Sequence, residues 1–111
     1  MEENFIKDLD KVFDNRLRLG IMGVLSARES VSFNELKEIL LHTDKNKEIT
    51  QVTDGNLASH IKKLEENQYI EIKKIHINLK SNTSYVMTQK GREAFKRHLN
   101  ALARIINQYN R

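Results

Sequence analysis

Apolar positions follow a helical period through the first half of the chain. They predict a first helix over about residues 3–14 and a second helix that begins after an N-cap at Asn15. Beyond it, the stretch "SVSFNELKEIL" predicts a short strand followed by a third helix. Ser32 and Glu35 have the spacing of a capping box at the start of that helix, in which each side chain accepts a hydrogen bond from the other residue's backbone N–H.

A further helix is predicted over residues 53–66. Thr53 is a suitable N-cap, and Leu57, Ile61 and Leu64 recur on one side of the helix. These three residues are therefore expected to form a buried ridge.

After residue 66 the period changes from helical to alternating. "YIEIKKIHI" and "SYVMT" predict a β-hairpin joined by the loop "NLKSNT", and Thr88 is a suitable N-cap for a long helix over residues 89–109. Helices, a hairpin and a long helix in this order are the arrangement of a winged helix-turn-helix, in which the hairpin is the wing. The predicted fold class is therefore mainly α with a small β-hairpin wing (α+β), in one domain over residues 1–111 with an N-terminal helix and a long C-terminal helix.

The composition indicates a globular protein, with 39% hydrophobic and 31% charged residues. The absence of cysteine excludes disulfides, thiolate metal sites and cysteine nucleophiles. No apolar run reaches the roughly 18 residues that span a membrane, so no membrane partner is expected. The opening "MEENFIKDLD" is acidic and lacks an apolar signal core, which favours mature sequence and a cytoplasmic location.

Charge is distributed unevenly along the chain. Residues 1–55 carry 8 Lys/Arg and 11 Asp/Glu, whereas residues 56–111 carry 11 Lys/Arg and 4 Asp/Glu. The basic half contains the helix over residues 53–66 and the hairpin. This asymmetry favours a polyanionic partner, although a solvated lysine-rich surface would show the same pattern.

The side of the 53–66 helix opposite its apolar ridge is small, polar and basic. At about 100° per residue it carries Gly55, Ser59 and the two lysines 62 and 63 near its centre, with Asn56 beside them and His60 on the flank. Asparagine pairs with adenine, and lysine reaches guanine edges or phosphates. Glycine costs helix stability but allows close approach, so the pattern indicates a helix that enters the DNA major groove. The alternative is a polar helix start followed by solvated lysines.

The predicted DNA-binding residues lie on this helix and on the wing over residues 73–84. They are Thr53, Gly55, Asn56, Ser59, His60, Lys62, Lys63, Lys74, Lys80 and Asn82.

Two motifs, T-D-G-N-L-x-x-H-x-x-K-L-E at 53–65 and T-x-x-G-R-x-A at 88–94, resemble the winged-helix domain of MarR/ArsR-like transcriptional regulators. The resemblance covers roughly residues 9–107. It implies a homodimer that binds a palindromic operator, with the 53–66 helix in the major groove and the wing on the backbone or in the minor groove. The chain departs from the family's pattern at Gln68 and Asn78, where relatives often have glycine, and in a longer connection at 43–52.

The terminal helices are expected to form the dimer interface, because a chain of this size is unlikely to bury both of their apolar sides by itself. The two reading helices would then lie about 34 Å apart. Packing of the long helix on its own domain is the alternative. The predicted interface residues are Phe5, Leu9, Phe13, Phe95, Leu99, Leu102, Ile106 and Tyr109.

Other classes of function find little support in the sequence. Four histidines are present, but no nucleophile–base spacing, phosphate-binding glycine loop or metal-ligand spacing accompanies them, so neither an enzyme nor a cofactor or metal site is predicted. A winged helix that binds a protein instead of DNA is the main alternative. An effector of unknown identity at the dimer interface stays open.

Overall fold

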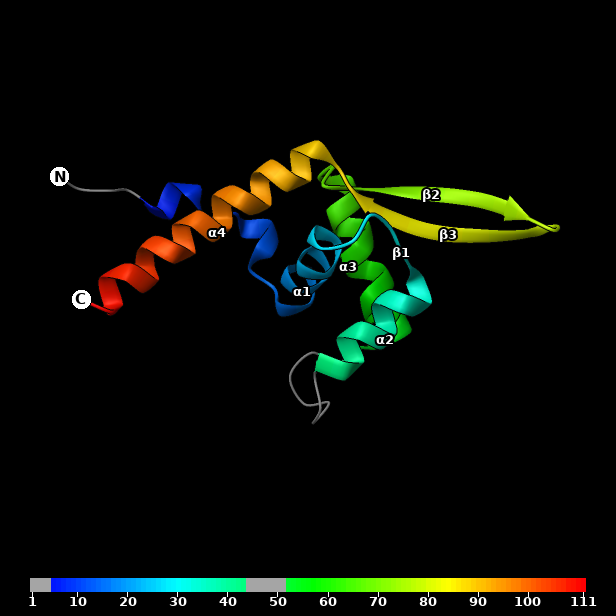
Figure 1. The fold of residues 1–111 in the computed structure, drawn as a ribbon, viewed down its shortest axis with the longest axis horizontal. Coiled ribbons are helices and arrows are strands. Elements are labelled where there is room, and N and C mark those ends of the chain that lie inside the picture. Colours follow the sequence, from blue (N-terminus) through cyan, green and yellow to red (C-terminus); the bar gives the residue numbers. More distant parts are fainter. Residues whose placement is uncertain (1–4, 44–51) are drawn as a thin grey trace.

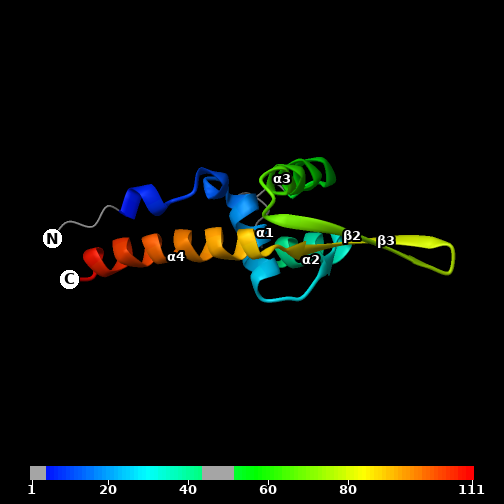
Figure 2. The same ribbon diagram turned by 90° about the horizontal axis from the view of Figure 1, so that it is seen from above.

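The computed structural model describes residues 5–43 and 52–111, arranged as helices with a small sheet (Figure 1). The elements are η1 (Phe5–Asp8), η2 (Lys11–Phe13), α1 (Arg16–Ser26), β1 (Val31–Ser32), α2 (Phe33–Thr43), α3 (Asp54–Glu66), β2 (Ile70–Ile77), β3 (Lys80–Met87) and α4 (Gln89–Tyr109). The wing, β2 and β3, projects from one end of the molecule, and α4 runs toward the other end (Figures 1 and 2). This is the predicted fold class.

The core lies where α1, α2, α3, the base of the wing and the start of α4 meet. α1 packs against both α2 and α3, so it supports the whole helix-turn-helix. Ile21, Met22 and Leu25 of α1 are fully buried, as are Leu57 and Leu64 of α3. Apolar burial of this kind is the main favourable term in folding, and here it determines where α3 lies.

The predicted helix caps are confirmed. The side chain of Asn15 accepts from two backbone N–H groups of α1, and the hydroxyls of Thr53 and Thr88 cap α3 and α4. Ser32 and Glu35 exchange both hydrogen bonds of the capping box, at 3.0 and 3.1 Å. Hydrogen bonds from the backbone and the side chain of Ser32 lower the pKa of the Glu35 carboxyl.

The predicted N-terminal helix over 3–14 is wrong. In the described part of this segment, two short 3₁₀ turns, η1 and η2, replace the helix. The backbone between them is extended at Asp10, which makes hydrogen bonds to distant residues instead of helical ones. The backbone N–H of Asp10 donates to Nδ1 of His98, and its carboxylate accepts from the Tyr69 hydroxyl and from the N–H of Val12. Contacts with His98 of α4 and with Tyr69 therefore end the first turn, and the Asp10 side chain caps the second.

The wing is longer and its turn is tighter than predicted. β2 and β3 pair from Ile70 with Met87 to Ile77 with Lys80, so only Asn78 and Leu79 form the turn in place of the loop "NLKSNT". Both turn residues have positive φ, 53° and 67°, as a two-residue hairpin turn of matching twist requires. Leu79 is not a residue type that indicates a tight turn, so the loop predicted from the sequence is longer than the turn in the structure.

β1 forms the third strand of the sheet, which has the order β1-β3-β2. Val31 pairs with Tyr85 and Ser32 with Ser84. The short strand was predicted, whereas its partner was not, because two residues carry no pairing information. The pairing attaches the start of α2 to the base of the wing.

Tyr69 joins α3, β2 and α4 at a single point. Its backbone N–H donates to Leu64 at the end of α3, and its carbonyl accepts from Thr88 at the start of α4. Gln68, just before it, adopts a φ of 64°, which lets α3 end at Asn67 as predicted. Gly91 lies directly over this backbone, since a Cβ there would be 2.1 Å from the Tyr69 carbonyl oxygen.

Gly91→Ala is therefore expected to lower the free energy of unfolding by about 3 kcal/mol, because either the backbone of Tyr69 or the whole of α4 must move. Gly55→Ala is the matched control. A Cβ at Gly55 meets no atom within 4 Å, so this change should raise the free energy of unfolding by up to about 1 kcal/mol. Urea unfolding followed by circular dichroism measures both. Equal stability of the two variants would contradict the close contact at Gly91.

Candidate nucleic-acid interface

α3 lies with one side in the core and the other side exposed. Ile61 is 3% exposed, and the two leucines of the predicted ridge are fully buried, so the ridge is confirmed. The residues predicted for the opposite side are all exposed: Thr53, Gly55, Asn56, Ser59, Lys62 and Lys63. The surface on which the DNA prediction depends is therefore open to a partner.

Gly55 occupies the first turn of this exposed side. Its φ is not positive, and a Cβ added at this position would meet no atom of another part of the protein within 4 Å. Neither the backbone conformation nor the packing of the protein requires glycine at this position, although glycine weakens the helix.

An ion pair that the sequence did not reveal links the start of α3 to α2. The Lys37 ammonium lies 2.6 Å from the Asp54 carboxylate, whose side chain is 71% exposed. Such a surface pair contributes at most about 1 kcal/mol, so it orients α3 more than it stabilises the fold. No local pattern connects two residues so far apart in sequence.

His60 is half-buried and bonded within the protein. Its Nδ1 lies 2.9 Å from the Arg18 guanidinium, and Nε of Arg18 donates to the Val12 carbonyl at 2.6 Å. Burial, and then the charge of Arg18, lower the pKa of His60. His60 therefore belongs to the flank of α3, as its position on the helix predicted, but one ring nitrogen is already occupied.

The predicted wing residues do not share one face. In the β2–β3 register, Lys80 and Asn82 lie on the face that also carries Lys73. Lys74 points to the opposite face with Thr83, the face that forms part of the core at the base of the wing. The predicted set is therefore divided, and the register groups Lys73, not Lys74, with Lys80 and Asn82.

Leu79 occupies the tip of the wing and is fully exposed. An exposed branched side chain with positive φ costs roughly 1–2 kcal/mol without any internal contact in return. It lies next to exposed Lys80 and Asn78. The tip is thus an apolar point with polar and basic neighbours.

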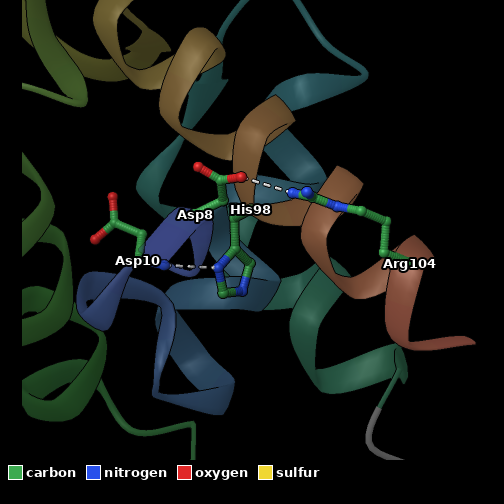
Figure 3. A network of polar contacts seen from close by, with 4 residues as sticks. All are labelled: Asp8, Asp10, His98 and Arg104. Atoms are coloured by element: carbon green, nitrogen blue, oxygen red, sulfur yellow. Dashed lines mark hydrogen bonds and ion pairs between the residues drawn. The ribbon is translucent and has the colours of Figure 1, made fainter. Parts of the chain in front are cut away.

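The N-terminal segment is attached along α4 (Figures 2 and 3). The Asp8 carboxylate accepts from the Arg104 guanidinium at 2.6 Å, which lowers the pKa of Asp8, and Asp10 N–H donates to His98 Nδ1 at 3.0 Å. Each contact joins residues roughly 90 positions apart. Together they hold the segment beside the last helix of its own chain.

These contacts divide the predicted dimer surface. Phe13 stands edge-on to Phe95, with ring centroids 5.4 Å apart, and both side chains are buried in the core of their own chain. By contrast, Leu99, Ile106 and Tyr109 are exposed by 43%, 56% and 87%. The remaining members of the predicted set, Phe5, Leu9 and Leu102, are partly buried.

The described residues contain no cluster of three or more His, Asp or Glu side chains able to hold a metal ion. Among the same residues, no helix combines the length and the apolar character that crossing a bilayer requires.

Known proteins share this arrangement. A family model described as a winged helix DNA-binding domain matches residues 45–106. The uncharacterized protein MJ0432 of Methanocaldococcus jannaschii is 39% identical over 89 residues, which cover 80% of this chain and 86% of that protein.

Solved structures of transcriptional regulators superpose on the chain as well. A transcriptional regulator homologue from Pyrococcus horikoshii OT3 has 29% identity and a TM-score of 0.79, covering 98% of this chain and 100% of that one. A PadR-like transcriptional regulator from Bacillus cereus has a TM-score of 0.68 at 20% identity, covering 91% and 94%, and at that identity the likeness concerns the fold alone.

The lowered pKa of His60 predicts a dependence of stability on pH. Below the ordinary histidine pKa of 6.5, the unfolded chain binds a proton that the folded chain resists, so the free energy of unfolding falls as the pH drops toward the lower folded pKa. His60→Gln should lose this contribution, whereas His42→Gln, an exposed control, should keep the wild-type dependence. Urea unfolding at pH 7.5 and pH 5.5 measures the difference. A wild-type slope in His60→Gln would contradict the assignment.

Proposed function

Because this chain belongs to the winged helix DNA-binding domain family, we propose that it is a transcriptional regulator that binds a palindromic operator as a homodimer. α3 is the reading helix in the major groove, and the wing contacts the backbone or the minor groove beside it. The observation that carries the proposal is the polar and basic strip of α3, whose residues are exposed in the described part of the chain.

Gly55 supports the assignment of α3. A residue that weakens a helix and that no internal contact requires has its explanation outside the protein, and the first turn is where a recognition helix meets the groove. The absence of a side chain there allows the DNA backbone or a base edge to approach the helix closely. Asn56 and Ser59 then supply donors and acceptors for base edges, and Lys62 and Lys63 supply positive charge.

The wing supplies a second contact. Lys80 and Asn82 share a face with Lys73 and lie near the tip, where they reach phosphates on either side of a groove. Lys74, on the other face, is the less favourable of the predicted wing residues. Two contacts of different kinds from neighbouring elements fix both the position and the orientation of the domain on a duplex.

The homodimer rests on the stripe of α4 formed by Leu99, Leu102, Ile106 and Tyr109. Exposed apolar side chains in a row mark interaction surfaces, and a two-fold axis would pair the stripe with its own copy. Ile6 of η1 is a further exposed apolar side chain, on the N-terminal segment. Phe13 and Phe95 contribute indirectly, by holding that segment and α4 together.

A small-molecule effector has a candidate place between the end of β3 and α4. Met87, Phe95 and Leu99 line a hollow there with Arg92 and Lys96 at its edge, a combination suited to an apolar anion. The hollow adjoins the proposed dimer stripe at Leu99, so a ligand there would act on the spacing of the two reading helices.

DNA binding is tested by two substitutions with different signatures. Asn56→Ala should cost about 1–3 kcal/mol on the preferred site, selected from a random pool, and little on other duplexes. Lys80→Ala should weaken binding to all duplexes alike and reduce the slope of log affinity against log salt by about 0.9. Arg97→Ala, at an exposed position of α4, is the matched control and should leave both quantities unchanged. Binding that ignores salt would favour the alternative, a winged helix that binds a protein partner.

The dimer is tested by Ile106→Glu, which puts a charge into the exposed stripe. The wild type is expected to show a dimeric mass in light scattering at micromolar concentration, and the variant a monomeric mass with an unchanged helical circular dichroism spectrum. Asn107→Glu, an exposed neighbour outside the stripe, should stay dimeric. A monomeric wild type would refute this part of the proposal.

A further inference from the structure

A hollow on the outer side of α3 joins this helix to α1. It is lined by Arg18, Ser59, His60, Lys62, Lys63 and Glu66 and has a volume of about 490 Å³. Arg18 lies on α1 and is not one of the predicted DNA-binding residues. It belongs to no recognisable motif, and its helix is not the one predicted to contact bases.

Arg18 is held in place before any ligand arrives. Its Nε donates to the Val12 carbonyl at 2.6 Å, and its Nη1 lies 2.9 Å from Nδ1 of His60. A guanidinium carries hydrogen-bond donors only, so Nδ1 of His60 must be the acceptor. Fixing a long, flexible side chain in advance reduces the entropy lost when a ligand binds.

The same hydrogen bond selects the tautomer of His60. With Nδ1 accepting, the neutral ring carries its proton on Nε2, which makes Nε2 a donor. The low pKa of His60 favours this neutral form. A neutral histidine can carry its proton on either ring nitrogen. The hydrogen bond from Arg18 to Nδ1 fixes the proton of His60 on Nε2, which is therefore a hydrogen-bond donor.

The remaining lining groups extend this set of donors. The Ser59 hydroxyl and the two ammonium groups of Lys62 and Lys63 join the guanidinium and the imidazole N–H, and Glu66 is the only carboxylate in the lining. Three cations against one anion, with donors in excess, suit an oxyanion that accepts several hydrogen bonds. Ser59 also belongs to the reading strip, so the hollow lies beside the bases that α3 would contact.

We propose that Arg18 and His60 form a binding site for one phosphate group, the DNA backbone phosphate that flanks the bases read by α3. This inference rests on the proposed function and deepens it. α1 thereby takes a direct part in DNA binding, and the phosphate contact fixes how far α3 enters the groove.

The test uses the preferred duplex in a series in which a single phosphate at a time is replaced by a neutral methylphosphonate. For the wild type, one linkage beside the α3 contact should weaken binding about tenfold when neutralised. In Arg18→Ala, neutralising that same linkage should have no further effect, while all other linkages keep their wild-type sensitivity. Arg97→Ala, an exposed arginine of α4, is the matched control and should keep the complete wild-type profile.

Two more variants separate a binding role from a structural one. Arg18→Gln can still donate to Val12 but carries no charge, so it should fold and should lose the linkage sensitivity, whereas Arg18→Lys should regain part of it. The ¹⁵N shifts of the His60 ring should report the Nε2–H tautomer in the wild type and a loss of that preference in Arg18→Ala.

A competition experiment with inorganic phosphate distinguishes a free anion from the DNA backbone as the ligand. Phosphate and chloride are titrated at equal ionic strength into the complex of the protein with the preferred duplex. If phosphate displaces the duplex more strongly than chloride, and Arg18→Gln abolishes this difference, the site also binds the free ion.

The outcomes are distinguishable. If folded Arg18→Gln retains the wild-type methylphosphonate profile, the phosphate site is refuted while the proposed function stands. If the wild type shows no salt-dependent binding to any duplex, the proposed function itself fails.

Discussion

Three elements meet at the backbone of Tyr69, and their mutual position depends on how closely they approach there. α3 ends on it, β2 begins from it, and Gly91 of α4 lies over its carbonyl with no room for a Cβ. Gln68 accepts a positive φ and Thr88 caps α4 beside it, bonding through its hydroxyl to the Gln68 carbonyl. α3, the wing and α4 are therefore fixed to one another by main-chain contacts, which tolerate little adjustment.

This junction explains how a small chain can hold the two proposed DNA contacts at a defined separation. The buried ridge of α3 fixes its rotation, so the strip with Gly55, Asn56 and Ser59 faces outward. The wing leaves the same junction and carries Lys80 and Asn82 far from the core. Surface charges of this kind add little to the stability of the fold, so folding does not determine which residues occupy these positions, and recognition of a partner can.

The N-terminal segment follows a different principle. Polar contacts, Asp8 with Arg104 and Asp10 with His98, attach it to α4 at the expense of its own helix (Figure 3). Together with the edge-on contact between the rings of Phe13 and Phe95, they cover one side of α4 and leave the side chains of Leu99, Ile106 and Tyr109 exposed. The surface proposed for a second copy and the side that packs on the same chain thus lie on one helix.

The sequence by itself determined the features that depend on neighbours along the chain. Caps at Asn15, Thr53 and Thr88, the capping box at Ser32 and the ridge of α3 all follow from spacings of two to four residues, which local backbone geometry dictates. The tertiary structure decided whatever depends on distant partners. It broke the first helix at Asp10, divided Lys74 from Lys80 through the strand register, and brought Arg18 to His60. Such contacts depend on packing between elements, and no residue's neighbours in sequence carry that information.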